Sequence, residues 1–316
     1  MRTPSPVQPA SSLDLPSYLA SRGRLIDEAL ERYLPPADHP PAIIHQAMRY
    51  SVFAGGKRLR PLLVVASTET CGGDPHAAVP VACAVELIHT YSLIHDDLPA
   101  MDNSDTRRGR PTCHIAFGEA IAVLAGDSLH ALAFILLAEV ATAVGAERAL
   151  AVSREIALAI GTEGMVGGQV LDLLGEGRSF PYTPPLPAAV RADMVREIHL
   201  RKTAALIRAC VRVGGILAGA DEPTLTALST YGERVGLAFQ IIDDVLDVVG
   251  EDEKLGKRSG SDAAQSKATY PAVYGISSSR EMAAQLTADA IAALGELGRR
   301  GRILRDLARS LLTREH

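Results

Sequence analysis

The feature that most constrains the fold is a series of long stretches in which apolar residues recur at helical spacing. Several of them, such as 78–97 and 115–145, are apolar on every face, which is typical of helices at the centre of a large bundle. Few segments alternate with a period of two, and only 4% of the residues are aromatic, which disfavours a β-sandwich or barrel. The sequence therefore predicts an all-α chain with roughly ten or more helices in one large bundle.

The organisation of the chain indicates one domain. Residues 1–16 carry four prolines among serines and threonines, so we expect a disordered extension there and a single domain over 17–316. The four cysteines lie far apart with no C-x-x-C pair, which favours reduced thiols and a cytoplasmic protein. The strongest apolar run, 131–138, is well short of the ~20 residues that a membrane span needs. A net charge of −5 argues against a general nucleic-acid binder.

An aspartate cluster lies in the otherwise apolar segment F-Q-I-I-D-D-V-L-D (239–247). Asp243 and Asp247 are four residues apart and Asp244 lies near Asp247 around the helix, so all three carboxylates are expected on one side. Like charges at this spacing repel, and burying an unpaired carboxylate costs several kcal/mol. The pattern therefore predicts a bound cation. Oxygen ligands without His or Cys suit Mg²⁺ or Mn²⁺.

A second aspartate cluster lies in I-H-D-D-L-P-A-M-D (94–102). Pro99 disfavours a helical conformation at the preceding residue, so the helix should end near Asp97 and Asp102 should return from the following loop to join Asp96. One such cluster is as often a solvated acidic helix end as a metal site. Two clusters embedded in apolar sequence favour metal binding, and Mg²⁺ held by few carboxylates completes its shell with water and substrate phosphate oxygens.

Basic residues stand near both clusters along the chain, where they could hold an anionic ligand. They are Lys57, Arg58, Arg60, Arg107, Arg108, Arg110, Lys202, Lys257, Arg258 and Lys267. His89 lies seven residues before Asp96 with Ser92 between them, so these three residues share one helix face. The sequence thus predicts an apolar helical cavity with carboxylates and bases at its mouth, suited to a diphosphate head and a hydrocarbon tail.

Several further segments occur in the same order as these clusters. They are G-G-K-R-L-R-P (55–61), S-L-I-H-D-D-L-P-A-M-D (92–102), R-R-G-R-P-T-C-H (107–114), G-G-Q-V-L-D (167–172), K-T (202–203), L-G-K-R-S-G-S-D (255–262) and K-A-T-Y-P (267–271). Together with 239–247 they resemble the short-chain trans-prenyl diphosphate synthases, most closely the bacterial farnesyl diphosphate synthases. The resemblance implies an all-α isoprenoid synthase fold around a central cavity, a homodimer, and Mg²⁺ as cofactor in a set of three ions, with Mn²⁺ as the alternative.

The resemblance also implies a role for each matching position. The Mg²⁺ ligands would be Asp96, Asp97, Asp102, Asp243, Asp244 and Asp247. The allylic diphosphate would be bound by Arg107, Lys202, Lys257 and Lys267, and isopentenyl diphosphate by Lys57, Arg60, His89 and Arg108. Thr203 and Gln240 match polar groups near the reacting carbons.

The implied reaction joins isopentenyl diphosphate to dimethylallyl or geranyl diphosphate and makes farnesyl diphosphate. Tyr91, five residues before Asp96, matches an aromatic residue that stops chain growth, although the helical wheel places Ser92 more directly below Asp96. A geranylgeranyl or geranyl diphosphate synthase is the alternative. A non-catalytic synthase subunit and a phosphohydrolase built on His95-Asp96 and His45 are further alternatives, but neither explains why both aspartate clusters are complete.

Overall fold

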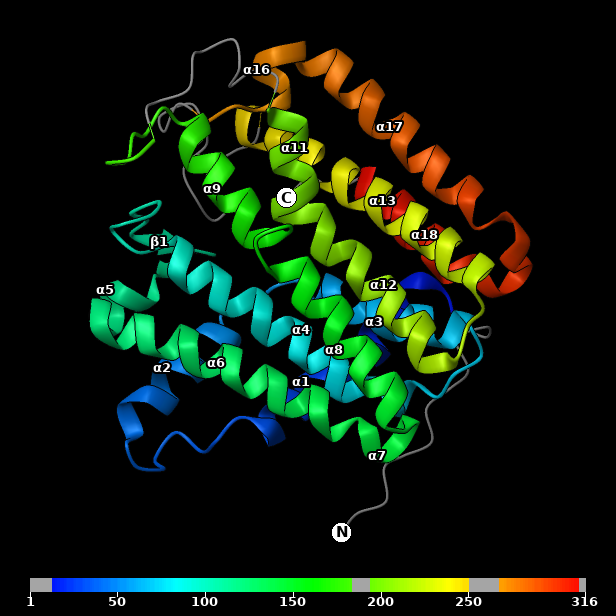
Figure 1. Cartoon of the computed structure of the whole chain (residues 1–316), viewed down its shortest axis with the longest axis horizontal. Coiled ribbons are helices and arrows are strands. Elements are labelled where there is room, and N and C mark those ends of the chain that lie inside the picture. Colours follow the sequence, from blue (N-terminus) through cyan, green and yellow to red (C-terminus); the bar gives the residue numbers. More distant parts are fainter. Residues whose placement is uncertain (1–12, 184–193, 250–266, 313–316) are drawn as a thin grey trace.

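Helices account for most of residues 13–183, 194–249 and 267–312, which the computed structural model describes (Figure 1). In the first half they are α1 (Leu15–Tyr33), α2 (Ala42–Val52), α3 (Leu59–Thr70), α4 (Pro75–Asp96), α5 (Cys113–Phe117), α6 (Glu119–Glu139), α7 (Ala141–Val144) and α8 (Ala146–Ile160). In the second half they are α9 (Met165–Gly175), α11 (Val195–His199), η2 (Leu200–Ala204), α12 (Ala205–Ala218), α13 (Glu222–Val249), α16 (Tyr270–Tyr274), α17 (Ile276–Ala293), η3 (Gly295–Gly301) and α18 (Arg302–Leu312).

The β-structure in these ranges is small and leaves the predicted all-α class confirmed. Strands β1 (Thr106–Arg107) and β2 (Arg110–Pro111) pair antiparallel in a hairpin after α4. Arg108 and Gly109 form its turn with positive φ angles of 54° and 72°. This hairpin lies at the end of α4 that carries the aspartates, near α5 and α9 in Figure 1.

The first helix begins earlier than the sequence predicts. Asp14 caps it by accepting a 2.9 Å hydrogen bond from the Ser17 amide, and Pro16 occupies the first turn, where its missing N–H is not needed. The expected extension 1–16 is therefore too long at its end, since Leu15 and Pro16 are helical. Residues 1–12 lie outside the described residues.

The core is centred on α4, which packs between α3 and α6, while α12 packs against α3 and α13. Along α4 nearly every side chain from Ala78 to Ile88 is buried, as its apolar sequence predicts. The helices α3 and α12 cross very closely at Gly214, because a Cβ atom there would lie 2.0 Å from the Ser67 hydroxyl oxygen. Small residues thus set the spacing of the central helices.

The apolar stretch 115–145 is not one helix. Gly118, with φ of 85°, separates α5 from α6, and a short break at Val140 separates α6 from α7. The positive φ at Gly118 is a conformation that glycine adopts without steric cost. Helical periodicity in sequence therefore predicted the helices but not these breaks.

Two helices, Pro75–Asp96 and Glu119–Val144, are long and apolar enough to cross a membrane by length and composition alone. The first is α4, whose most apolar window is 67% buried in the core. The second covers α6 and α7, and its window is 39% buried, so much of its apolar surface faces outward. Such helices are weak evidence for a membrane span, because core and interface helices have the same composition.

Candidate active site

A cavity of about 700 Å³ lies among α3, α4, the turn after α4, the hairpin, α9, η2 and α13. Most of the residues singled out in the sequence meet there. They are Arg60, His89, Tyr91, Ser92, Asp96, Asp102, Arg107, Arg108, Lys202, Thr203, Gln240 and Asp243. Its apolar wall includes Met165, Val166, Val170, Leu173 and Phe239. Carboxylates, bases and an apolar surface therefore share one cavity, as the sequence predicts.

The first aspartate cluster is arranged as Pro99 predicts. Helix α4 ends at Asp96, and Asp97 caps it. The chain then turns back so that the Asp102 amide donates a 2.8 Å hydrogen bond to the Asp96 carbonyl. Asp96 and Asp102 both line the cavity as a result.

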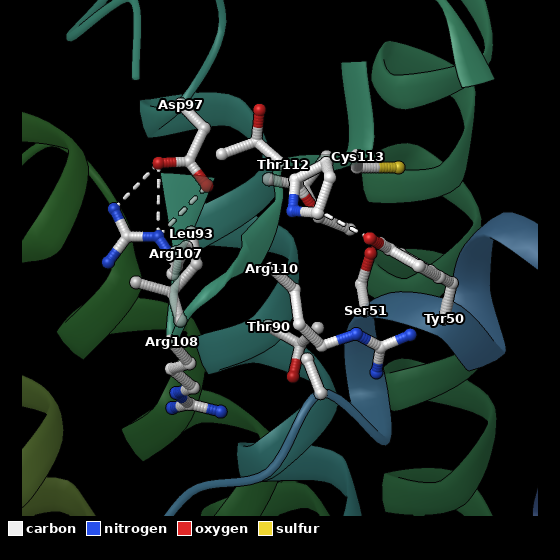
Figure 2. Close-up of a pocket in the computed structure, with 13 residues that line it drawn as sticks. Tyr50, Ser51, Thr90, Leu93, Asp97, Arg107, Arg108, Arg110, Thr112 and Cys113 are labelled. Carbon is white, nitrogen blue, oxygen red and sulfur yellow. Dashed lines mark hydrogen bonds and ion pairs between the residues drawn. The ribbon is translucent and has the colours of Figure 1, made fainter. Parts of the chain in front are cut away.

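Asp97 points to a smaller adjoining pocket and is held by Arg107 (Figure 2). The Arg107 Nε lies 3.0 and 2.9 Å from the two Asp97 carboxylate oxygens, and its Nη2 lies 2.7 Å from Oδ1. Figure 2 shows Arg108 pointing away from Asp97, and Arg108 hydrogen-bonds the Gly55 carbonyl instead. The hairpin therefore places two successive arginines at different parts of the site.

The second cluster divides between two directions. Asp243 lines the cavity, whereas Asp244 accepts hydrogen bonds from the Tyr270 amide at 3.0 Å and from Gln240 Nε2 at 3.1 Å. The expectation that all three carboxylates share the cavity side is met for Asp243 but not for Asp244, because consecutive residues on a helix lie about 100° apart. Asp247 is 2% exposed and is also not among the described residues that line the cavity.

Lys202 and Thr203 reach the site from a π-helical turn, η2. Such turns are rare and are frequent at functional sites, since the extra residue redirects the side chains. Lys202 Nζ lies 2.6 Å from the Asp172 carboxylate, and Thr203 donates a 2.9 Å hydrogen bond to Gln240. Helix α9 can approach this turn because of Gly168, where a Cβ atom would lie 2.3 Å from the Lys202 amide nitrogen.

The basic residues around the G-G-K-R-L-R-P segment separate into different environments. Arg60 lines the cavity, and its buried Nε has no hydrogen-bond partner among the described residues. Arg58 faces away from the cavity and pairs with Glu86 at 2.7 Å and Asp27 at 3.0 Å. Lys57 is exposed on the turn before α3 and does not line the cavity.

The remaining predicted bases follow the second cluster. Lys267 pairs with Asp102 at 3.1 Å, so it is close to the cavity mouth. Lys257 and Arg258 lie outside the described residues.

Burial and charge shift the pKa values of the site in opposite directions. Burial raises the pKa of Asp96, against the opposing effect of Lys202. Burial alone would lower the pKa of Lys202, but Asp172, Asp96 and Asp102 raise it above its ordinary value. Burial, followed by Arg60 and Arg108, holds the pKa of His89 well below its ordinary value, so the imidazole is neutral. The site therefore combines a charged lysine, a neutral histidine and carboxylates that are costly to leave uncompensated.

The donor set fits a hard divalent cation. Asp96, Asp102 and Asp243 present carboxylate oxygens to one cavity from two helices and a turn. Within residues 13–183, 194–249 and 267–312, no three acidic, His or Cys side chains converge into a preformed metal cluster. Protein cations instead lie on the carboxylates, with Lys267 on Asp102 and Arg107 on Asp97. These contacts identify positions that favour positive charge.

Tyr91 contributes to the cavity wall next to α6. Its ring lies 4.8 Å from the His130 ring and 5.8 Å from the His95 ring, measured between centroids. Burial raises the pKa of Tyr91 to about 12. His95 itself contacts the Val123 carbonyl at 3.0 Å and lies 4.0 Å from an Asp127 carboxylate oxygen, whereas His45 contacts the His39 carbonyl, so the two histidines have different partners.

Sequence reasoning missed several residues of the site. Asp172, which pairs with Lys202, lies in the G-G-Q-V-L-D segment three residues after Gln169, which lines the cavity. Their spacing of i and i+3 was a signal that could have identified them. Glu176 and His199 carried no such signal, because only the folded chain brings them near Lys267 and Asp244.

Comparison with known proteins gives a consistent result. Residues 41–295 match the family model described as polyprenyl synthetase. The chain is 44% identical to a geranylgeranyl diphosphate synthase of Cyanophora paradoxa over 89% of this chain and 90% of that protein. It is 43% identical to a farnesyl diphosphate synthase of Bacillus subtilis over 96% of this chain and 99% of that protein.

A solved structure agrees with both relatives. The apo structure of an FPP/GFPP synthase from Zymomonas mobilis superposes with a TM-score of 0.80 at 38% identity, covering 94% of this chain and 98% of that one. The isoprenoid synthase fold that the motifs imply is thereby confirmed. Because the family model matches most of this chain, and because Asp96, Asp102 and Asp243 meet at one cavity, this chain belongs to the polyprenyl synthetase family.

Proposed function

We propose that this protein is a trans-prenyltransferase that condenses isopentenyl diphosphate with an allylic diphosphate. The observation that carries the proposal is the composition of the main cavity. Asp96, Asp102 and Asp243 line it together with Lys202 and apolar side chains such as Val166 and Phe239. Relatives named as farnesyl and geranylgeranyl diphosphate synthases support the same reaction class.

Mg²⁺, in a set of three ions with Mn²⁺ as the alternative, is the proposed cofactor. Its ligands would be Asp96, Asp97, Asp102, Asp243, Asp244 and Asp247. When bound, it would withdraw negative charge from the leaving diphosphate. Asp97 and Asp244 would have to exchange their present partners, Arg107 and the Tyr270 amide, at least in part.

Two groups of bases would hold the two diphosphates. Arg107, Lys202, Lys257 and Lys267 are proposed for the allylic substrate, and Lys57, Arg60, His89 and Arg108 for isopentenyl diphosphate. Arg60 supports this division, because its buried Nε–H has no hydrogen-bond partner in the described part of the chain and needs an acceptor. Neutral His89 can donate one hydrogen bond to a diphosphate oxygen without adding a positive charge near the metal.

The chain's own residues would then control the fate of an allylic cation. Apolar side chains such as Met165 and Phe239 exclude water from the cavity, which prevents water from quenching the cation. The Thr203–Gln240 pair, 2.9 Å apart, would direct polar oxygens toward the reacting carbons. The carbon–oxygen bond between the allylic carbon and its diphosphate would break to give this cation. Attack by the isopentenyl double bond on the allylic carbon would then form the new carbon–carbon bond, and the released diphosphate would accept the proton that the resulting cation loses.

Farnesyl diphosphate, with fifteen carbons, is the proposed product. Tyr91 lines the cavity and its ring is packed against His130, so it can act as a floor below Asp96, with Ser92 beside it. Geranylgeranyl diphosphate is the second candidate, since relatives of both names are similar to this chain.

We further propose that the chain from Leu15 onward is one domain and that the protein is a cytoplasmic homodimer. Helix α6 exposes Val123, Leu124 and Ile135, with Leu124 and Ile135 more than half exposed, and a second copy would cover this apolar surface. All four cysteines are free thiols, which suits a reducing compartment.

The test is incubation with Mg²⁺, isopentenyl diphosphate and either dimethylallyl, geranyl or farnesyl diphosphate, followed by mass spectrometry of the products. We expect a fifteen-carbon main product from the first two. A twenty-carbon main product would favour the geranylgeranyl alternative, and no prenyl product from any pair would overturn the proposal. Release of phosphate from nucleotides, assayed in parallel, would point to the phosphohydrolase instead.

A further inference from the structure

The segment that follows α9 contacts the turn that carries Asp102. Arg178 donates hydrogen bonds to the carbonyl oxygens of Ala100 at 3.1 Å and Met101 at 2.5 Å. Its Nε also donates a 2.8 Å hydrogen bond to the Glu176 carboxylate, which fixes the orientation of the guanidinium. One planar group thus joins the end of α9 to the aspartate turn.

Glu176 and Lys267 hold the same turn from the side-chain face. Lys267 Nζ lies 3.1 Å from Asp102 Oδ2 and 4.0 Å from Glu176 Oε1. The Glu176 side chain is only 4% exposed, and its Oε1 accepts no hydrogen bond from the described residues. Glu176 is therefore a buried carboxylate that faces an ammonium shared with a proposed metal ligand.

The backbone of the turn explains why these contacts matter. The Met101 amide donates to the Leu98 carbonyl at 2.9 Å, and the Asp102 amide to the Asp96 carbonyl at 2.8 Å. The carbonyls of Ala100 and Met101 are outside this internal set, and Arg178 supplies their donors. The two terminal nitrogens of one guanidinium each bind a carbonyl here, and the single ammonium of lysine reproduces this geometry poorly.

We propose that Arg178 and Glu176 are positioning residues that set the divalent-metal affinity of the first aspartate cluster. Arg178 fixes the turn so that Asp102 faces Asp96 across the cavity mouth. Glu176 is the alternative partner for the Lys267 ammonium, which must leave Asp102 when a divalent cation binds there. The inference rests on the proposed function only for the identity of that cation.

The first test measures amide hydrogen exchange over residues 98–104 in the metal-free protein. Arg178→Ala should speed this exchange about tenfold or more, because the turn loses two charge-assisted hydrogen bonds. Arg178→Lys should give an intermediate rate. The matched control is Arg234→Ala, since Arg234 pairs with Asp289 at 2.6 Å, is similarly exposed, and lies on α13 away from the turn. Equal exchange in Arg178→Ala and the control would overturn the role of Arg178.

The second test titrates Mg²⁺ by calorimetry in the presence of inorganic pyrophosphate. Arg178→Ala and Glu176→Gln should each raise the half-saturating Mg²⁺ concentration about five- to tenfold, whereas Arg234→Ala should not. The KM for isopentenyl diphosphate at saturating Mg²⁺ should change less than twofold. Wild-type Mg²⁺ titrations in both variants would overturn the proposal.

These tests separate the positioning role from the proposed function. Absence of condensation by the wild-type protein would contradict the function, while the exchange measurement would still test the role of Arg178 on the turn. Should Arg178→Ala fail to fold, Arg178→Lys and Glu176→Gln decide the question by the same two measurements.

Discussion

The buried Glu86 carboxylate should be essential for stability, and Glu86→Gln tests this most directly. Glu86 on α4 is 3% exposed and accepts a 2.7 Å hydrogen bond from Arg58 Nη1. Arg58 is itself 8% exposed, has φ of 50°, and donates to the Val52 carbonyl at 2.9 Å. Burial lowers the pKa of Arg58, but Glu86 and Asp27 together raise it above its ordinary value, so the guanidinium is charged in the fold.

The expected loss follows from this geometry. Replacing one partner of a buried ion pair leaves the other charge uncompensated, which costs about 3–5 kcal/mol. Glutamine keeps one oxygen that can accept from Arg58, which places the expected loss near 3 kcal/mol, or about a hundredfold in the folding equilibrium. The other partner, Asp27, is 52% exposed, so Asp27→Asn should cost less than about 1 kcal/mol.

Urea unfolding followed by circular dichroism measures both losses at one protein concentration. Arg58→Met combined with Glu86→Met should recover much of the stability lost in either single variant, because no buried charge is then left unpaired. If Glu86→Gln costs no more than Asp27→Asn, the Glu86–Arg58 pair is not the buried, charged interaction described above, and the reasoning fails.

Three further predictions concern the cavity. Asp243→Asn should lower turnover by about 10²-fold or more in the condensation assay, because a proposed metal ligand loses its charge; wild-type turnover would rule that role out. Tyr91→Ala should shift the product toward twenty carbons by chromatography, and an unchanged length would place the limit elsewhere. The wild-type protein should lose stability between about pH 7 and 5, because His89 binds a proton in the unfolded chain but not in the fold, where its pKa is low. His89→Gln should lose less stability over this range. Equal shifts of the urea midpoint with pH in the two proteins would contradict this.

The local sequence predicted the features that depend on neighbouring residues along the chain, namely the helices, the end of α4 and the side chains that share one helix face. Helical periodicity predicted the all-α class, and Pro99 predicted both the end of α4 near Asp97 and the return of Asp102. His89, Ser92 and Asp96 line one cavity because they share a face of one helix. Each of these inferences needs only backbone geometry within about ten residues along one element.

Residue chemistry alone could not distinguish two neighbouring arginines that have different roles in the folded protein. Arg58 and Arg60 are two residues apart in the same basic segment, yet one is buried against Glu86 and the other lines the cavity. The turn before α3, where Arg58 has a positive φ, decides between them. The resemblance to the prenyl diphosphate synthases singled out Arg60, but residue chemistry alone gave both side chains the same charge and neither side chain a direction.

Contacts between distant parts of the chain were decided only by the tertiary structure. Asp244 binds the Tyr270 amide 26 residues away, and Arg178 binds the Ala100 carbonyl 78 residues away. Helical periodicity predicts which face of a helix is apolar. The hydrogen-bond partner of a carboxylate at the boundary of that face depends on which neighbouring element places a donor there. The sequence by itself therefore determined the helices and the chemical inventory of the cavity. The packing of α9, α13 and η2 decided which carboxylates face it, because burial and pairing energies depend on neighbours that only the folded chain supplies.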